Sequence, residues 1–149
     1  MRKKISMFVL FLTMAISLSA CGGPSKESLL KNAITADPNF MQDIVDGAKA
    51  NEAKLVKDFK GKAVLYDGVI VANISSSGTV TLGLSQVKTS FVLPEEDLLT
   101  FEEKDVISVV GTISEITVLK KSADISGSDI RITLDPAYLV DVGGPSFLK

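Results

Sequence analysis

The hydrophobic pattern divides the chain into three parts. Residues 5–18 form an almost uninterrupted apolar block behind the basic residues Arg2, Lys3 and Lys4. Between residues 25 and 60 apolar side chains recur at three- and four-residue spacings, which predicts helices with one buried face. After Gly61 the period changes to two, which is typical of half-buried strands. We therefore expect a leader, a helical arm and a β domain.

Two helix starts are visible in the arm. Ser25 is a capping residue ahead of Leu29-Leu30, and Asp37-Pro38 pairs a capping residue with a proline at the first helical position. The second helix should run to about residue 59 with one apolar face: Met41, Ile44, Val45, Ala48, Leu55, Val56 and Phe59. We expect this face to cover the end of a sheet rather than to bind a partner.

Five strands are predicted in the β domain, at residues 62–74, 79–84, 87–93, 105–117 and 129–134. A turn at 75–78, a short helix at 94–99 and a polar loop at 120–128 separate them. Gly68 interrupts the first strand and should mark a bulge. The bend at this bulge would let the long first strand pair in both halves of a closed barrel. Gly111 lies within the fourth strand, and Phe101 should plug a barrel end. Five strands with a helix after the third have the outline of an OB-fold barrel.

Three short segments add a resemblance to this outline: Asn51-Glu52, Phe59-Lys60-Gly61-Lys62, and the run from Asp105 to Gly111. Over about residues 48–141 the chain resembles the tRNA-anti-like OB-fold family of secreted and lipid-anchored bacterial proteins. It departs from the family pattern at Phe59, usually Tyr, and at Lys104-Asp105, usually Gly-Asp. The resemblance implies a mainly β, five-stranded OB-fold barrel preceded by one or two helices. It implies no contact with transfer RNA outside the cytoplasm.

The N-terminus has the layout of a secretory signal, and its apolar block is shorter than the ~20 residues of a membrane-spanning helix. Leu18-Ser19-Ala20-Cys21 resembles a bacterial lipobox, which implies cleavage before Cys21 and lipidation of its thiol. The alternative is a buried free cysteine beside an ordinary cleavage site. We expect a signal peptide (1–20), a lipidated tether (21–24), a helical arm (25–60), an OB-fold barrel (61–142) and a C-terminal tail (143–149). The protein would then lie outside the cytoplasm, at the outer membrane of a two-membrane cell or the outer face of the plasma membrane.

The N-terminal leader and the remainder of the chain carry opposite net charges. The chain of 149 residues has a formal charge of −2, but its first 20 residues carry three cations and no acid, so residues 21–149 carry −5. The lysines at 54, 57, 60 and 62 invite a phosphate-binding interpretation, but a helix end explains those at 54 and 57. The acidic balance argues against polyanions, and the sequence therefore predicts that nucleic acid is not a partner.

Most enzyme chemistries are excluded by composition, because the chain has no His, no Trp and one Cys. It cannot build a Cys/His zinc site, a Ser-His-Asp triad or an internal disulfide. Glu102, Glu103 and Asp105 are a conceivable acid/base pair or cation site, but a solvated turn explains them, and residues 124–129 are a polar loop without an EF-hand pattern. We expect no catalytic activity, no metal and no cofactor.

A binding module is the remaining function class. An OB-fold offers its second and third strands to ligands, and Leu82, Lys88, Phe91 and Tyr66 are the candidate ligand face, although core packing also explains Phe91. Tyr138 is a further residue that could stack on a ligand. The leading hypothesis is a lipid-anchored module that binds an envelope protein, peptide or glycan, and the alternative is an oligonucleotide-binding OB-fold. The sequence leaves the ligand and the oligomeric state open.

Overall fold

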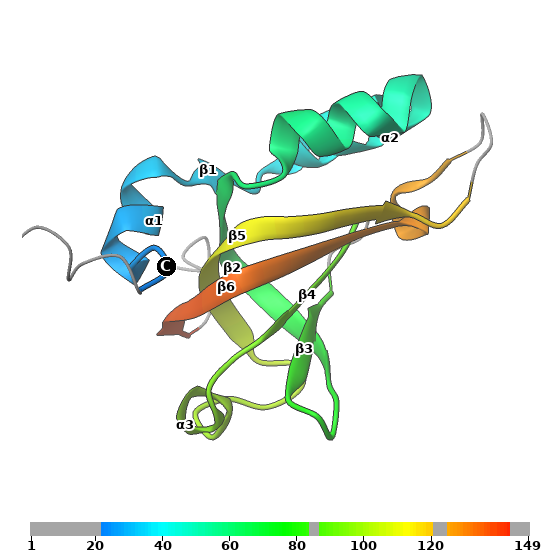
Figure 1. Ribbon diagram of the computed structural model, residues 1–149. Helices are drawn as coiled ribbons and strands as arrows, with labels where there is room; N and C mark the ends of the chain where they lie inside the picture. Colours follow the sequence, from blue (N-terminus) through cyan, green and yellow to red (C-terminus); the bar gives the residue numbers. More distant parts are fainter. Residues whose placement is uncertain (1–21, 84–86, 121–124, 144–149) are drawn as a thin grey trace, which may run out of the picture.

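The computed structural model describes residues 22–83, 87–120 and 125–143, and its centre is a closed five-stranded barrel (Figure 1). The strands are β2 (Ala63–Ile74), β3 (Thr79–Leu82), β4 (Lys88–Val92), β5 (Val106–Val118) and β6 (Ile130–Val142). They follow the order β2-β3-β4-β6-β5, and pairing of β5 with β2 closes the barrel. The β4–β6 pair is parallel and the other barrel pairs are antiparallel. This is OB-fold topology, and the predicted fold class is confirmed.

The two predicted helix starts are confirmed by their caps. The Ser25 hydroxyl accepts a hydrogen bond from the Ser28 backbone N–H at 3.3 Å and starts α1 (Lys26–Asn32). The Asp37 carboxylate accepts from the Phe40 N–H at 2.8 Å and starts α2 (Pro38–Phe59). Between the helices, β1 (Ile34–Thr35) pairs in parallel with the start of β2, and the sequence pattern did not predict this short strand.

The second helix is not continuous, in contrast to the prediction. Asn51 is extended (φ −166°, ψ 97°), and its side-chain oxygen accepts from the backbone N–H three residues later, at 3.0 Å, which caps a new helical segment. The two segments fold back on each other, because the rings of Phe40 and Phe59 meet edge to face with centroids 5.8 Å apart. Where they cross, a Cβ on Gly47 would lie 2.8 Å from a Leu55 methyl carbon. Thus α2 is a helical hairpin, and Gly47 permits its close packing.

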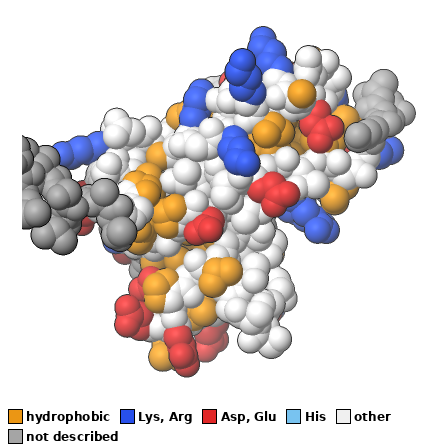
Figure 2. Space-filling view, in the orientation of Figure 1, with side chains coloured by type: hydrophobic (Ala, Val, Ile, Leu, Met, Phe, Trp, Pro, Cys, Tyr) orange, Lys and Arg blue, Asp and Glu red, His pale blue; other side chains and the backbone are white. Residues whose placement is uncertain are grey.

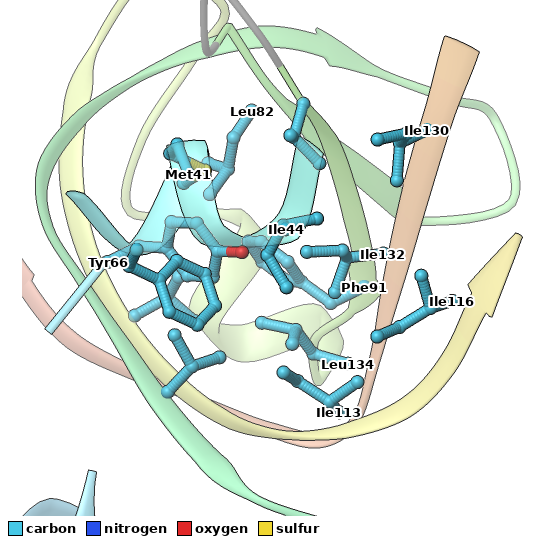
Figure 3. Packing of buried hydrophobic residues seen from close by; sticks show 14 of the residues in the cluster. Met41, Ile44, Tyr66, Leu82, Phe91, Ile113, Ile116, Ile130, Ile132 and Leu134 are labelled. Carbon is cyan, nitrogen blue, oxygen red and sulfur yellow. The ribbon is translucent and has the colours of Figure 1, made fainter. Parts of the chain in front are cut away.

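The hairpin closes one end of the barrel, as the buried face of the arm predicted. Met41 and Ile44 of α2 lie among the inward-pointing side chains of the strands (Figure 3). The other end is closed by Phe101, which is 4% exposed, and by the short helix α3 (Glu95–Leu98), where Leu98 packs against the β2–β3 turn at Gly78. The barrel interior is therefore filled by side chains rather than open to a ligand.

Both mid-strand glycines have structural explanations. At Gly68 (φ 62°) the pairing of β2 with β5 shifts register, which confirms the predicted bulge. The bulge is held by Ser108, whose hydroxyl accepts from the Gly68 N–H at 3.0 Å and donates to the Asp67 carboxylate at 2.7 Å. At Gly111 a Cβ would lie 2.9 Å from the Leu134 Cβ, so glycine lets β5 and β6 approach closely.

The last strand is longer than predicted. It runs to Val142 rather than ending at Leu134, past a cis Asp135–Pro136 bond. A proline normally ends a strand because it lacks the N–H that the ladder needs. The register shifts between Gly111 and Ile113, so Pro136 falls in an irregular part of the ladder and pairing resumes beyond it.

Candidate ligand-binding surface

The outer surface of β2, β3, β4 and β6 carries a row of short polar side chains. Asn73 pairs with Thr81, Thr81 with Ser90, and Ser90 with Thr133, so four neighbouring strands each contribute one hydrogen-bonding group. On β3, β4 and β6 the residues on either side of these positions, such as Val80, Phe91 and Leu134, point inward and are buried. Adjacent strands lie about 4.8 Å apart, so the row crosses the barrel with that spacing. We call these four residues the polar row.

Two cations lie beside the polar row. Lys88 of β4 and Arg131 of β6 are direct register partners in the parallel pair, and both side chains are exposed. The next residue across the barrel is Thr117 of β5, which pairs with Arg131. Two adjacent cations beside polar side chains form a suitable contact for an anionic group.

Three of the four residues predicted for the ligand face lie in the core instead. Tyr66, Leu82 and Phe91 are 0%, 2% and 1% exposed, and all three point into the barrel (Figure 3). Only Lys88 lies on the outer surface. Strand alternation explains the result, because Leu82 and Phe91 belong to the inward set of β3 and β4. The core explanation weighed for Phe91 is therefore correct.

Tyr66 forms a buried polar pair across the barrel. Its hydroxyl oxygen accepts a hydrogen bond from the Thr89 hydroxyl at 2.9 Å, and both side chains are 0% exposed. Burial raises the pKa of the Tyr66 hydroxyl far above its usual value, and the hydrogen bond from Thr89 offsets this only in part. The pair is a structural link between β2 and β4 rather than a ligand contact.

Arg131 lies on the outer surface beside Lys88 but was not among the residues predicted for the ligand face. Its signal in the sequence is the alternation of the last strand, in which Ile130 and Ile132 point inward and Arg131 outward. What the sequence pattern lacks is the parallel pairing that brings Arg131 beside Lys88. The only aromatic side chain of β3 and β4 is the buried Phe91, and β6 has one aromatic side chain, the half-buried Tyr138. Tyr138, near the end of β6, donates its hydroxyl to the Pro24 carbonyl at 3.0 Å.

The acidic residues gather at the α3 end of the barrel. Residues 94–105 contain six carboxylates and one lysine, a net charge of −5. Figure 2 shows a group of acidic side chains at this end, whereas basic and acidic side chains are mixed over α2. Two carboxylates stabilise the local backbone: Asp105 accepts from the Glu102 N–H at 2.8 Å, and Glu103 accepts from the Asn73 amide at 3.0 Å and from the Ile74 N–H at 3.1 Å. Among the described residues no group of acidic side chains is placed to hold a metal ion.

The predicted lipidation site, Cys21, falls outside the described residues, because it lies just before the first of them. Within the part that the structure describes, no helix has the length and apolar character to cross a bilayer. Pro24, the last residue of the predicted tether, accepts a hydrogen bond from Tyr138, and Ser25 caps α1.

No family model matches the chain, and no curated protein matches it. Two solved structures are similar in fold. One is a protein from Klebsiella pneumoniae proposed to be a nucleic acid-binding lipoprotein, with 18% identity, a TM-score of 0.48, and cover of 80% of this chain and 100% of that one. The other is the mitochondrial single-stranded DNA-binding protein Rim1 of S. cerevisiae, with 8% identity, a TM-score of 0.34, and cover of 57% and 100%.

Both of these proteins are described as binding nucleic acid. The expectation that nucleic acid is not a partner is therefore corrected. Its basis was the net charge of the chain, and net charge averages over the strongly acidic α3 end and the outer surface of β4 and β6, where Lys88 and Arg131 are neighbours. Membership of the tRNA-anti-like family stays a prediction.

Proposed function

We propose that the protein is a lipid-anchored, non-catalytic OB-fold binding module of the bacterial envelope, and that its ligand lies across the outer surface of β3, β4 and β6. The observation that carries this proposal is the exposed pair Lys88 and Arg131 beside the polar row. The filled barrel interior supports the choice of an outer surface.

An extended anionic polymer suits this surface best, and single-stranded oligonucleotide is the probe we choose. Lys88 and Arg131 would contact backbone phosphates, and the polar row would donate hydrogen bonds to phosphate or sugar oxygens. Because no described aromatic side chain offers a stacking platform there, backbone contacts should dominate and sequence preference should be weak.

Salt dependence gives a quantitative test. For single strands each neutralised phosphate contributes about −0.7 to the slope of log K against log salt, so two contacts give about −1.4 and a roughly sevenfold loss of affinity between 50 and 200 mM salt. The double variant Lys88→Gln/Arg131→Gln should lose most of this slope and about tenfold in affinity at low salt. The matched control is Lys49→Gln, an exposed lysine on α2, which should bind like the wild type. No oligonucleotide binding at 20 mM salt would exclude this ligand class.

An envelope glycan or peptide is the second candidate, and the polar row is the observation that favours it. Four hydroxyl or amide groups in register offer neutral hydrogen bonds to sugar hydroxyls or to an extended backbone. Binding of solubilised cell-wall fragments should then be nearly independent of salt. Ser90→Ala/Thr133→Val should weaken it, while the Lys88→Gln/Arg131→Gln variant should not.

The anchor rests on the lipobox-like run before Cys21. Two or more acyl chains hold a protein stably at a bilayer, whereas a single chain binds marginally. We expect Cys21→Ser to move the protein from the detergent phase to the aqueous phase and to remove the acyl mass from the N-terminal peptide. Unchanged partitioning of this variant would refute the anchor. In a two-membrane cell Gly22 after the cysteine favours sorting to the outer membrane.

A further inference from the structure

The link between the proposed anchor and the barrel is very short. Pro24 is fixed because its carbonyl accepts the Tyr138 hydroxyl at 3.0 Å, and the next residue, Ser25, already caps α1. Only Gly22 and Gly23 lie between Pro24 and Cys21. A fully extended chain covers at most about 3.6 Å per residue, so Pro24 lies within about 11 Å of the Cys21 backbone.

An apolar groove opens at this point of the surface. It has a volume of about 400 Å³ and runs between α1, β1 and the start of β2, with Pro24, Leu29, Ile34 and Ala63 among its lining residues. Ile34 is 36% exposed, and Leu30 on the neighbouring face of α1 is 37% exposed. Apolar side chains are thus exposed beside the residue that is tied to the anchor.

The groove also has a polar part. Lys62 and Thr112 line it. The Lys62 ammonium lies 5.1 Å from the centroid of the Phe59 ring, and the Thr112 hydroxyl oxygen is buried without a hydrogen-bond partner in the described part of the chain. Apolar walls and polar groups in one groove suit contact with the interface of a bilayer, where acyl chains meet polar headgroups.

We infer that α1 and the groove beside it form a membrane-facing surface, which rests on the lipid bilayer. This inference depends on the proposed acylation of Cys21. The hydrogen bond from Tyr138 to Pro24 sets the orientation of the barrel relative to the bilayer. It fixes Pro24 to the barrel, so only Gly22 and Gly23 remain as a flexible link to Cys21. The barrel therefore contacts the bilayer through α1 and is not separated from it by a long flexible linker.

The orientation keeps the proposed ligand surface free. Helix α1 packs against β2 and β5, whereas Lys88 and the centre of the polar row lie on β3, β4 and β6 (Figure 1). Contact with the bilayer and contact with a ligand can therefore occur together.

Site-specific fluorescence quenching tests the orientation. The only native thiol, Cys21, is blocked when it is acylated, so one introduced cysteine carries one label. The full acylated protein would be reconstituted in vesicles of phosphatidylcholine and phosphatidylglycerol (3:1) that contain a brominated lipid. A label at Leu30→Cys is compared with a label at Val92→Cys, which is 60% exposed on β4.

We expect at least threefold stronger quenching at position 30 than at position 92. Ten Gly/Ser residues inserted between Gly23 and Pro24 should reduce this ratio, and so should Tyr138→Phe. Flotation of the protein with the vesicles but equal quenching at both positions would overturn the orientation alone. Failure to float, with no acyl mass on Cys21, would overturn the anchor and this inference with it.

Discussion

The hydrogen bond between Thr89 and Tyr66 joins two fully buried side chains, and removing it tests how much this buried polar pair stabilises the barrel. Tyr66→Phe deletes the acceptor and leaves the Thr89 hydroxyl without its partner. Thr89→Val deletes the donor and leaves the Tyr66 hydroxyl unpaired. The double variant replaces both groups by apolar groups of similar shape.

The expected cost follows from the burial of both groups. Leaving one buried polar partner unsatisfied costs about 1–3 kcal/mol, whereas removing both partners is nearly neutral. We therefore expect Tyr66→Phe to lower the free energy of unfolding by about 2 kcal/mol and the double variant by less than either single variant. With an m-value of about 2 kcal/mol/M in urea, the midpoint of Tyr66→Phe should fall by about 1 M.

The assay is a double-mutant cycle by urea unfolding of residues 22–149 at pH 8. A coupling energy of about 1–3 kcal/mol between positions 66 and 89 is expected. If Tyr66→Phe unfolds within 0.5 kcal/mol of the wild type, or if the two single effects simply add, the buried pair does not stabilise the barrel and the reasoning is wrong.

The same pair makes a pH prediction. Because burial raises the folded-state pKa of Tyr66 above its unfolded value of about 10, its hydroxyl stays protonated in the barrel when the unfolded chain ionises. Its contribution to stability is complete below about pH 10 and is lost as the pH rises above that value. The difference in free energy of unfolding between the wild type and Tyr66→Phe should therefore decrease between pH 8 and pH 11. A difference that stays constant over this range would contradict the raised pKa of Tyr66.

Three further predictions concern single residues. Gly111→Ala should destabilise the barrel by about 1–3 kcal/mol in urea unfolding, since its Cβ would lie 2.9 Å from the Leu134 Cβ, and a variant as stable as the wild type would refute the close approach. Asn51→Ala should lower the free energy of unfolding by about 1 kcal/mol, because the second segment of α2 loses its cap. Asn51→Asp should retain most of that stability, because its carboxylate can accept the same hydrogen bond. Hydrogen bonds from Ser126 hold the pKa of Asp129 below its usual value, so an NMR titration of its carboxyl carbon should have a midpoint below about 3.9.

Local signals were sufficient for most of the fold. The caps at Ser25 and Asp37 act within three residues, so the sequence shows them directly. Strand periodicity and the bulge at Gly68 are similarly local, and together with the helix after the third strand they define the barrel. The fold at Asn51 was missed because asparagine is compatible with a helix and the apolar spacing continues across it. What decides the turn is the contact between Gly47 and Leu55, which exists only in the folded hairpin.

The candidate surface was harder to predict, because strand sidedness must be known before a surface residue can be distinguished from a core residue. Period-two alternation separates two sets of residues, but the sequence does not say which set faces inward, and the choice reverses every side chain. Leu82 and Phe91 were candidates for the ligand face and lie inward, as the core explanation weighed for Phe91 requires, whereas Lys88 is exposed on the outer surface. Its partner Arg131 is adjacent only through the parallel pairing of β4 and β6, a contact between distant parts of the chain.

The position of the proposed ligand surface on the outside of the barrel has a consequence for how strongly a ligand can be held. With the barrel interior filled and its ends plugged by α2 and Phe101, a ligand on the outer surface would be held by a few contacts, which give each molecule a modest affinity. With the proposed anchor and orientation, copies fixed in the same bilayer would face the same way and engage one long polymer at many points, and avidity would multiply their weak individual contacts. The density of the protein in the membrane, more than the chemistry of any one barrel, would then determine how long a polymer stays bound.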